Sequence, residues 1–508
     1  MLCTRMKCCL QRISRRSKMD RCFFKNRSMN TKVLLLLLLF FTCCVKVKKD
    51  TTPFLIGTGV VEITPPEGFP LYGVPAVKST GVKDPLYAKA IVFSQGEAQG
   101  VLLVCNLLGI PRDLSRIVRE RASDQTGIPF QNISISATHT HTSPGITAAF
   151  KEYALRELSG RLTEEDQKSY FTFLIKGMTE AIVLATKNQQ EVEIVSGKGH
   201  APGISFNRRY LMTDGRVRFN PGHQNPGIVR PAGPVDPDVH FVLLQPKDTV
   251  ANSASLTVFA SHYVRGGTEF SSDYPFYLQE QLKTIFGREH ISVFGLGACG
   301  NINTVNPEEE AGEDPDVKVK RIGNILAHAV ENALPGARQG EPDFCVVSRV
   351  LYLPMQDYTG EELLWSKEGT EPLYPERDFL TKRRKLKISE WGVQPPLEQL
   401  RIHEAVTPAV SGEPYRLPVE IHVFRLDSET AIVTMPGELF SELGLSLKKR
   451  SPFANTMLIE LANADIAYIP TLQAFKEGDY EAVNSRLAPG AGEEMVNQAL
   501  EILEGFKK

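Results

Sequence analysis

The most informative stretch of this 508-residue chain is Asn132-Ile-Ser-Ile-Ser-Ala-Thr-His-Thr-His-Thr-Ser-Pro-Gly145. Isoleucine and alanine alternate with serine and threonine, which is the period-two pattern of a strand with one buried face. Continuing that alternation puts His139 and His141 on the apolar face, where the strand runs into a turn. Two buried imidazoles at a strand end are costly unless they bind something, and a divalent metal is the first candidate. The alternative is that both are half-exposed and bonded to the backbone of the turn.

Outward from this stretch, strand-like apolar runs alternate with amphipathic helical patterns. This alternation, without internal repeats, predicts an α/β fold with mixed sheets and flanking helices in a single large domain. The predicted strands cover residues 88–94, 101–108, 132–141, 239–244, 255–262, 291–294, 421–425, 430–434 and 457–462, and the predicted helices cover 114–126, 164–188, 316–334, 439–449 and 492–508.

Two further segments differ in composition from their surroundings. Residues 201–237 are rich in Gly, Pro, Asn and Arg and are long for a loop. Ordered loops of that length are often functional. Residues 361–401 are charged, contain two proline breaks, and indicate a surface insertion.

Charge and cysteine are distributed unevenly along the chain. Residues 1–44 hold 10 of the 58 basic residues and one of the 59 acidic residues, so the remainder has a net charge of −10. A body this acidic argues against a nucleic-acid partner. Six of the nine cysteines also lie in that leader. The other three are Cys105, Cys299 and Cys345, too few and too widely spaced for a disulfide framework or a zinc ribbon.

The leader has the features of a targeting segment. Its apolar run at residues 33–45 is shorter than the roughly 20 residues of a membrane span and has the length of a signal-peptide core. The residues from Met29 onward fit the basic N-terminal region of a signal peptide better than the long basic stretch before them, so we expect translation to begin at Met29. Cys43 and Cys44 fit a loose lipoprotein cleavage box, and a plain secretory signal or an uncleaved anchor is equally open. Each alternative predicts a body outside the cytoplasm, as a periplasmic or outer-membrane lipoprotein or a secreted protein.

Four further places carry side chains suited to a metal or an anion. His262 closes an apolar strand, Glu438 follows a strand and a Pro-Gly turn and is expected to start a helix, and Tyr468 lies before Ile-Pro-Thr. The adjacent Arg208 and Arg209 form either an anion clamp or a solvated pair. Singly, each of the first three has an ordinary explanation: a hydrogen-bonded strand-end histidine, a carboxylate at a helix N-terminus, and a core tyrosine. Together, two strand-end histidines and a glutamate would make a zinc site with an open position, as catalytic zinc requires.

One glycine motif points elsewhere. Gly295-Leu-Gly-Ala-Cys-Gly300 fits G-x-G-x-x-G after a predicted strand. A dinucleotide site also needs a helix that begins at the third glycine, and a loop is expected at residues 301–307 instead. We therefore reject NAD binding and expect a loop whose backbone closely approaches a ligand.

The ordered set of motifs resembles the neutral/alkaline, non-lysosomal ceramidase family. Thr138-His-Thr-His-Thr-Ser-Pro-Gly145 is similar to the family's Thr-His-Thr-His-Ser-Gly-Pro-Gly. The other matches, in the same order, are residues 59–66, Leu71-Tyr-Gly73, Asn207-Arg208, Phe259-Ala-Ser-His262, Pro436-Gly-Glu438, and Tyr468-Ile-Pro-Thr471 with Tyr480. The resemblance implies that residues 55–508 form a ceramidase-like N-terminal catalytic domain, without the C-terminal immunoglobulin-like domain of full ceramidases.

Carried over residue by residue, the resemblance implies a Zn²⁺ ion held by His139, His262, Glu438 and Tyr468. It also implies that the substrate amide is oriented, and its oxyanion stabilised, by His141, Arg208 and Tyr480. Zinc lowers the pKa of its bound water toward about 7 and polarises the carbonyl, and donors aimed at the developing oxyanion lower the barrier. Tyr468 would bind as a phenolate, which metal proximity makes feasible.

One segment departs from the family pattern. Ceramidases carry Gly-Asp-Val-Ser-Pro-Asn with an essential serine, whereas this chain has Gly300-Asn-Ile-Asn-Thr-Val305. Asn303 takes the place of the serine, with Thr304 beside it. An amide is no nucleophile, but it can donate a hydrogen bond to an oxyanion. Either zinc and water alone carry the reaction, or Thr304 substitutes, or the substrate is not ceramide, or Asn303 marks an inactive relative.

Three hypotheses follow from the sequence. The first is a zinc-dependent amidohydrolase outside the cytoplasm that cleaves an N-acyl amide, such as N-acylsphingosine, into a fatty acid and a sphingoid base, and that reaches the membrane through a lipid anchor. The second, motivated by Asn303, is a non-catalytic lipid- or glycan-binding lipoprotein on the same scaffold. The third is a metal-dependent hydrolase of a different amide or of an ester.

Overall fold

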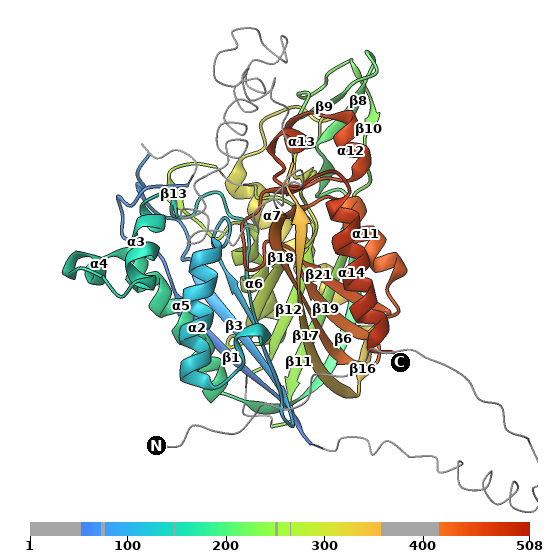
Figure 1. Cartoon of the computed structure of the whole chain (residues 1–508). Coiled ribbons are helices and arrows are strands. Elements are labelled where there is room, and N and C mark those ends of the chain that lie inside the picture. The colour runs from blue at the N-terminus through green and yellow to red at the C-terminus, as the bar shows by residue number, and fades with distance from the viewer. Residues whose placement is uncertain are drawn as a thin grey trace, which may run out of the picture. The chain divides into compact units, whose positions relative to one another are not determined.

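Two β-sheets form the centre of the protein (Figure 1). The computed structural model describes residues 52–507 except 73–76, 147, 249–251, 265 and 357–415. The larger sheet has nine strands in the order β14-β12-β11-β6-β1-β3-β4-β5, with β16 paired to β6, and the second sheet has the order β17-β18-β19-β21.

The strands of the larger sheet are β1 (Phe54–Glu62), β3 (Tyr87–Gln95), β4 (Ala98–Cys105), β5 (Ile133–Ala137), β6 (Gln190–His200), β11 (Asp238–Pro246), β12 (Ala254–Phe259), β14 (Ile291–Leu296) and β16 (Arg338–Gly340). Those of the second sheet are β17 (Pro342–Pro354), β18 (Arg416–Asp427), β19 (Thr430–Thr434) and β21 (Asn455–Ile459).

Helices cover the outer face of each sheet. Those packed on the larger sheet are α2 (Arg112–Thr126), α3 (Ala148–Leu158), α5 (Tyr170–Lys187), α6 (Tyr274–Phe286) and α7 (Pro315–Ala333). Those packed on the second sheet are α11 (Ser441–Arg450) and α14 (Ala491–Gly505).

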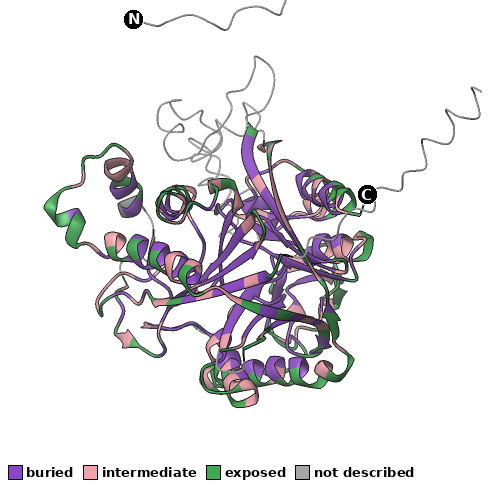
Figure 2. Ribbon diagram, turned by 90° about the horizontal axis from the view of Figure 1, so that it is seen from below, coloured by how far each residue is buried: buried purple, intermediate pink, exposed green. Residues whose placement is uncertain are grey.

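The side chains of β3 explain the layered arrangement. Ala88, Ala90 and Val92 belong to the core beneath the helices, whereas Ile91 and Phe93 belong to a second core shared with the other sheet. Because successive side chains of a strand point to opposite faces, an apolar run that lacks polar alternation buries both. The result is a helix–sheet–sheet–helix stack, and Figure 2 shows buried strands at its centre and exposed outer helix faces.

The larger sheet combines parallel and antiparallel pairs, which confirms the predicted mixed α/β class. β1 runs antiparallel to β3 and β6, while β4 and β5 are parallel, as are β12 and β14. The sheet is also strongly curled, because β14 and β5 lie near opposite ends of the strand order and yet contact each other. Curling brings the loops after β5 and β12 to the same place.

The remaining elements are short. The strand pairs and the small sheet consist of β2 (Gly81–Val82), β13 (Glu269–Phe270), β7 (Phe206–Asn207), β15 (Ile302–Asn303), β20 (Glu438–Leu439), β22 (Tyr468–Ile469), β8 (Arg209–Met212), β9 (Val217–Phe219) and β10 (Ile228–Pro231). The short helices are α4 (Glu164–Lys168), α12 (Leu472–Glu477) and α13 (Tyr480–Asn484), with 3₁₀ turns at Phe130–Asn132 and Leu334–Gly336.

Two predicted strands end before their histidines. The strand predicted for residues 132–141 stops at Ala137, because His139 has a φ of 64° and its N–H bonds to the carbonyl of Leu107 instead of a neighbouring strand. A left-handed residue of this kind cannot continue a strand. Likewise, the strand predicted for 255–262 ends at Phe259. The strand alternation that was expected to place His139 and His141 on one face therefore ends before it reaches them.

The helix predicted for residues 164–188 is two helices. Ser169 is extended, with a ψ of 157°, and its side chain accepts from the N–H of Thr172, so it caps α5 and separates it from α4. A capping serine within an otherwise periodic pattern gives little sequence signal. The helix predicted from residue 439 begins at Ser441, and Glu438 lies in β20. Its expected position at a helix N-terminus was therefore wrong.

Other differences come from missed elements. Strands β6 and β17 and helix α6 were not predicted, and the expected loop at 201–237 contains β7 to β10. The leader and the insertion predicted at 361–401 lie outside the described residues. Among the residues that are described, no helix has the length and apolar composition needed to cross a membrane.

Candidate metal centre

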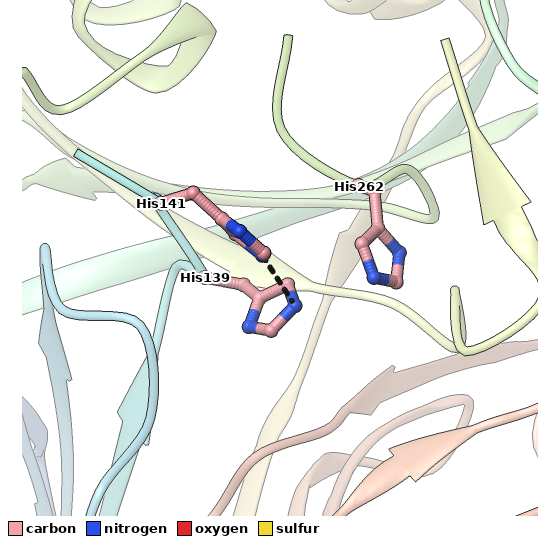
Figure 3. A group of neighbouring side chains, drawn as sticks. All are labelled: His139, His141 and His262. Carbon is pink, nitrogen blue, oxygen red and sulfur yellow. Dashed lines mark hydrogen bonds between the residues drawn. The ribbon is translucent and has the colours of Figure 1, made fainter. Parts of the chain in front are cut away.

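Three imidazoles meet beside the carboxyl ends of β5 and β12. One nitrogen of each of His139, His141 and His262 lies within 4.8 Å of the others. Nε2 of His141 is 3.3 Å from Nε2 of His139, and the ring of His262 approaches from the other side (Figure 3). His139 and His262 are each 3% exposed, so water satisfies neither ring. The alternative of two half-exposed histidines is therefore excluded for His139, while His141 is partly exposed.

Backbone carbonyls fix the orientation of two rings. Nδ1 of His139 is 2.7 Å from the oxygen of Leu108, and Nδ1 of His262 is 2.8 Å from the oxygen of Cys299. Since a carbonyl only accepts, each Nδ1 carries the hydrogen. A neutral ring then keeps its Nε2 lone pair directed toward the cluster, which is how metal-binding histidines are commonly held.

A carboxylate from the short strand β20 completes the cluster. Oε2 of Glu438 lies 3.2 Å from Nε2 of His262 and 3.5 Å from Nε2 of His139, and this buried oxygen has no hydrogen-bond partner. When both imidazoles are neutral, their lone pairs and this carboxylate oxygen face one another and repel, and burying such a group is costly. A cation among the three atoms removes this cost, so the residues fit a divalent metal site.

Tyr468 reaches the site through strand pairing. In the parallel pair β20–β22, Tyr468 stands opposite Glu438, and the guanidinium of Arg208 lies 5.3 Å from the centre of the Tyr468 ring. Burial, followed by the charge of Glu438, raises the pKa of Tyr468 well above its usual value, so the phenol keeps its proton in the absence of a cation.

The charges at the centre are strongly coupled. Burial lowers the pKa of His262 to about 3, with Arg208 as the next cause, and burial also holds the pKa of His141 well below its usual value. Burial opposes the shift at His139 and Glu438, yet their mutual attraction outweighs it, so the pKa of His139 is raised and that of Glu438 is well below its usual range. At neutral pH, His141 and His262 are therefore in the neutral form that binds metal.

Arg208 and Arg209 are buried, so the alternative of a solvated pair is excluded. Nη1 of Arg208 is 3.1 Å from Nε2 of His262, and its side chain is directed at the cluster. Arg209 is directed away from the cluster, toward the backbone oxygen of Gly478 and the carboxylate of Glu477. Only one of the two adjacent arginines is therefore placed to meet a ligand at the cluster.

The two other predicted polar residues lie on short elements. Tyr480 begins α13, and its ring stacks on Phe219 with centroids 4.6 Å apart and lies 5.7 Å from the ring of Tyr468. Asn303 lies in β15, where its amide nitrogen donates to Oδ1 of Asn220 and its oxygen accepts from the N–H of Val305. Part of the hydrogen-bonding capacity of the Asn303 amide is therefore used within the loop.

Two residues near the cluster escaped the sequence analysis. The ring of Tyr263 stacks on that of His141, with centroids 3.6 Å apart and an angle of 15°. Glu460 is fully buried, and its Oε2 accepts from the N–H groups of Cys299 and Leu439. Glu460 thus ties together the loops that hold His262 and Glu438. The position of Tyr263 next to His262 could have identified it from the sequence, whereas no sequence feature pointed to Glu460.

Close backbone contact holds the two loops in place. The N–H of Gly300 donates to the oxygen of Leu439, and a Cβ at Gly300 would lie 2.3 Å from the oxygen of Glu438. The loop after β14 was expected to approach a ligand closely, and the close approach seen here is to the backbone of Glu438 and Leu439 instead. Left-handed backbone also gathers here, at His139 and at Leu461, Asn463 and Ala467 before Tyr468. Such strain is typical of functional sites.

The chain is similar to known proteins over part of its length. The family model described as "Neutral/alkaline non-lysosomal ceramidase, N-terminal" matches residues 54–265. The chain is 26% identical over 216 residues to a neutral ceramidase of Mycobacterium tuberculosis, covering 41% of this chain and 32% of that relative. It is 28% identical over 171 residues to neutral ceramidase A of Dictyostelium discoideum, covering 31% of this chain and 22% of the relative. The matched segments thus span about a third or less of these relatives.

The fold comparison extends over more of the chain. The crystal structure of neutral ceramidase from Pseudomonas aeruginosa matches with a TM-score of 0.62 at 19% identity, covering 90% of this chain and 75% of that one. Identity at this level supports a shared fold alone. The resemblance to the neutral/alkaline non-lysosomal ceramidases is therefore confirmed, in sequence over residues 54–265 and in fold over most of the chain.

Proposed function

We propose that this protein is a zinc-dependent hydrolase of N-acyl amides, with N-acylsphingosine as the leading substrate and a fatty acid and a sphingoid base as products. The observation that carries the proposal is the convergence of the Glu438 carboxylate on two imidazole nitrogens, at 3.2 Å and 3.5 Å from a buried oxygen that has no hydrogen-bond partner. The names of the matched relatives add support for the amide substrate.

His139, His262 and Glu438 are the proposed zinc ligands, with Tyr468 as a fourth that binds after losing its proton. A zinc ion there supplies a Lewis acid for the amide carbonyl and lowers the pKa of a water molecule. With the first three ligands alone, zinc would keep the open position that catalytic zinc requires, and with Tyr468 bound as well a water molecule would be the fifth ligand. The deprotonation required of Tyr468 is favoured by the positive charge of Arg208 beside its ring.

The remaining residues act on the substrate. Arg208 holds a permanent charge in a buried site, so its Nη1 is suited to stabilise the negative charge that develops on the amide oxygen. His141 stays neutral and accepts or returns a proton near that atom. The Tyr480 hydroxyl is the third proposed donor, and Asn303 has one remaining amide hydrogen for the same task.

The test is turnover of N-acylsphingosine and of simple N-acyl amides, with and without chelator, for the wild type, His139→Ala and Asn303→Ser. We expect metal-dependent release of fatty acid that is lost in His139→Ala. Chelator-resistant turnover that survives His139→Ala would refute the proposal.

A second candidate function is favoured by Asn303, whose amide is engaged in loop hydrogen bonds where the related enzymes have a serine. It is a non-catalytic lipid- or glycan-binding protein on the same scaffold. Zinc retained without turnover on a broad amide and ester panel supports it, whereas turnover of another amide or of an ester supports a metal hydrolase with a different substrate.

We also propose that the protein acts outside the cytoplasm, as a periplasmic or outer-membrane lipoprotein or a secreted protein. The apolar run and the cysteines of the leader support this. Mass spectrometry of the mature protein tests it: an acylated Cys43 or Cys44 at the N-terminus, or cleavage nearby, is expected, and an intact leader in a cytoplasmic protein would contradict it.

A further inference from the structure

Each side of the Arg208 guanidinium has its own partner. Nε donates to Oε1 of Glu481 at 2.9 Å, and Nη2 donates to the oxygen of Gly300. Nη1 is left to face Nε2 of His262 at 3.1 Å. A planar guanidinium held at two of its three nitrogens has no freedom to rotate. The direction of Nη1 is therefore set by the two other contacts.

Glu481 is the charged member of that pair of contacts. Its side chain is fully buried, and its second oxygen, Oε2, accepts from Nη1 of Arg209 at 3.1 Å. One carboxylate thus bridges two adjacent arginines that are 5% and 1% exposed. Glu481 lies in α13, directly after Tyr480, so the same contact also places that helix against Arg208.

We propose that Glu481 is a positioning residue that holds Arg208 with Nη1 directed at the histidine–carboxylate cluster. The proposal rests on the proposed function for its kinetic test. The carboxylate touches none of the cluster atoms, and it acts through Arg208. With Gln at this position one oxygen remains, and either arginine can take it, so Arg208 loses its fixed orientation.

A purely structural role for Glu481 predicts something different. Arg209 also anchors α12 and α13, because it donates to the carboxylates of Glu477 and Glu481 and to the backbone oxygen of Gly478. Arg209→Gln removes this anchor and keeps the bond between Glu481 and Arg208. It is therefore the matched control: if Glu481 merely fastens the helices, both variants lose activity alike.

The first experiment is steady-state hydrolysis of a short-chain N-acylsphingosine by zinc-loaded full-length protein. We expect Glu481→Gln to lower kcat by about 10-fold to 100-fold, since misplacing a donor by about 1 Å costs up to about 100-fold. KM and bound zinc stay within about threefold of the wild type. We expect Arg209→Gln to retain kcat within about threefold. Equal loss in both variants, or loss through KM or zinc content alone, overturns the proposal.

Glu477→Gln covers the case in which Arg209→Gln does not fold. It removes only the partly exposed partner of Arg209 and leaves both contacts of Glu481 in place. We expect wild-type kcat for this variant. A decrease matching that of Glu481→Gln would again assign Glu481 to fastening the helices.

A second readout does not depend on activity. In protein labelled with ¹⁵N-arginine, the buried Nε–H of Arg208 exchanges slowly with water, and Arg208→Lys assigns its signal. We expect exchange at least about 10-fold faster in Glu481→Gln and unchanged in Glu477→Gln. If the wild type hydrolyses no amide, the proposed function fails while this result still decides the positioning of Arg208. Unchanged exchange in Glu481→Gln would overturn the proposal by itself.

Discussion

Replacing Glu438 with glutamine removes one charge at the centre of the cluster and leaves the side-chain shape almost unchanged. In protein without metal, Oε2 faces an imidazole nitrogen at 3.2 Å and another at 3.5 Å and has no hydrogen-bond partner. The amide of glutamine supplies the missing hydrogen. The substitution is thus expected to have opposite effects with and without zinc.

The magnitudes follow from that one oxygen. A buried polar atom without a partner costs about 1–3 kcal/mol, and a new hydrogen bond contributes about 1 kcal/mol. We therefore expect the unfolding free energy of metal-free Glu438→Gln to be about 1–3 kcal/mol higher than that of the wild type. With zinc the variant lacks an anionic ligand. Mutation of residues that merely orient a metal ligand lowers metal affinity by about 10-fold to 100-fold. For the loss of the ligand itself, we expect zinc affinity to fall by at least about 100-fold, or about 2.7 kcal/mol.

Urea unfolding of both proteins, in chelator and in a fixed excess of zinc, measures both effects. The competing account is that protonated His139 forms a structural ion pair with Glu438, in line with the raised pKa of this histidine. Breaking a buried pair of this kind destabilises by about 3–5 kcal/mol. Metal-free Glu438→Gln that is less stable than the wild type would therefore refute the reasoning.

Three further substitutions test other parts of the account. Gly300→Ala brings a Cβ within 2.3 Å of the Glu438 oxygen, whereas the control Gly336→Ala adds a Cβ with no neighbour within 4 Å. Gly300→Ala alone should therefore cost about 1–3 kcal/mol of stability and weaken zinc binding in titrations. Equal behaviour of Gly300→Ala and Gly336→Ala would contradict the close approach. Asn303→Ser removes one loop hydrogen bond, so stability should fall by about 1 kcal/mol while amide turnover rises, and lower stability with unchanged turnover would place residue 303 away from the reacting atoms. Burial lowers the pKa of His422 to about 4 from an unfolded value of 6.5, so the unfolded state takes up this proton first as the pH falls, and stability is lost between pH 6.5 and 4. Between pH 7 and 5, His422→Phe should therefore lose about 2 kcal/mol less stability in urea unfolding than the wild type, and equal losses would exclude this histidine as the cause.

The site was predictable where short motifs carry chemistry. His139, His141 and His262 were identified from their positions after apolar runs, and these three rings meet in the structure. The strand pairing that sets Glu438 opposite Tyr468 involves two residues on each side, too few for any periodic signal. For those two, the resemblance to a family was needed.

Long-range partners were beyond the sequence analysis. The sequence left Arg208 and Arg209 as a clamp or a solvated pair, because nothing near them indicates burial. Their partner Glu481 lies more than 270 residues away and belongs to a five-residue helix. Hydrogen-bond networks of this kind depend on how the layers pack, and no local pattern encodes that.

The fold shows the same division. Strand β19 was predicted residue for residue, because an apolar run between turn signals defines it. Strand β6 was missed, and it contains Gly197 and Gly199, which are unfavourable in strands. A Cβ at Gly199 would lie 2.2 Å from the oxygen of Ala329 in α7, so the close packing of that helix requires glycine there.

We have proposed that side chains distant in sequence hold one zinc ion. X-ray absorption at the zinc edge, on protein loaded with one equivalent, tests this most directly. We expect about four or five nitrogen and oxygen neighbours at about 2.0–2.1 Å, with outer-shell scattering from imidazole that is weaker in His262→Ala. Zinc with an all-water shell and no imidazole scattering, or a spectrum unchanged in His262→Ala, would contradict it.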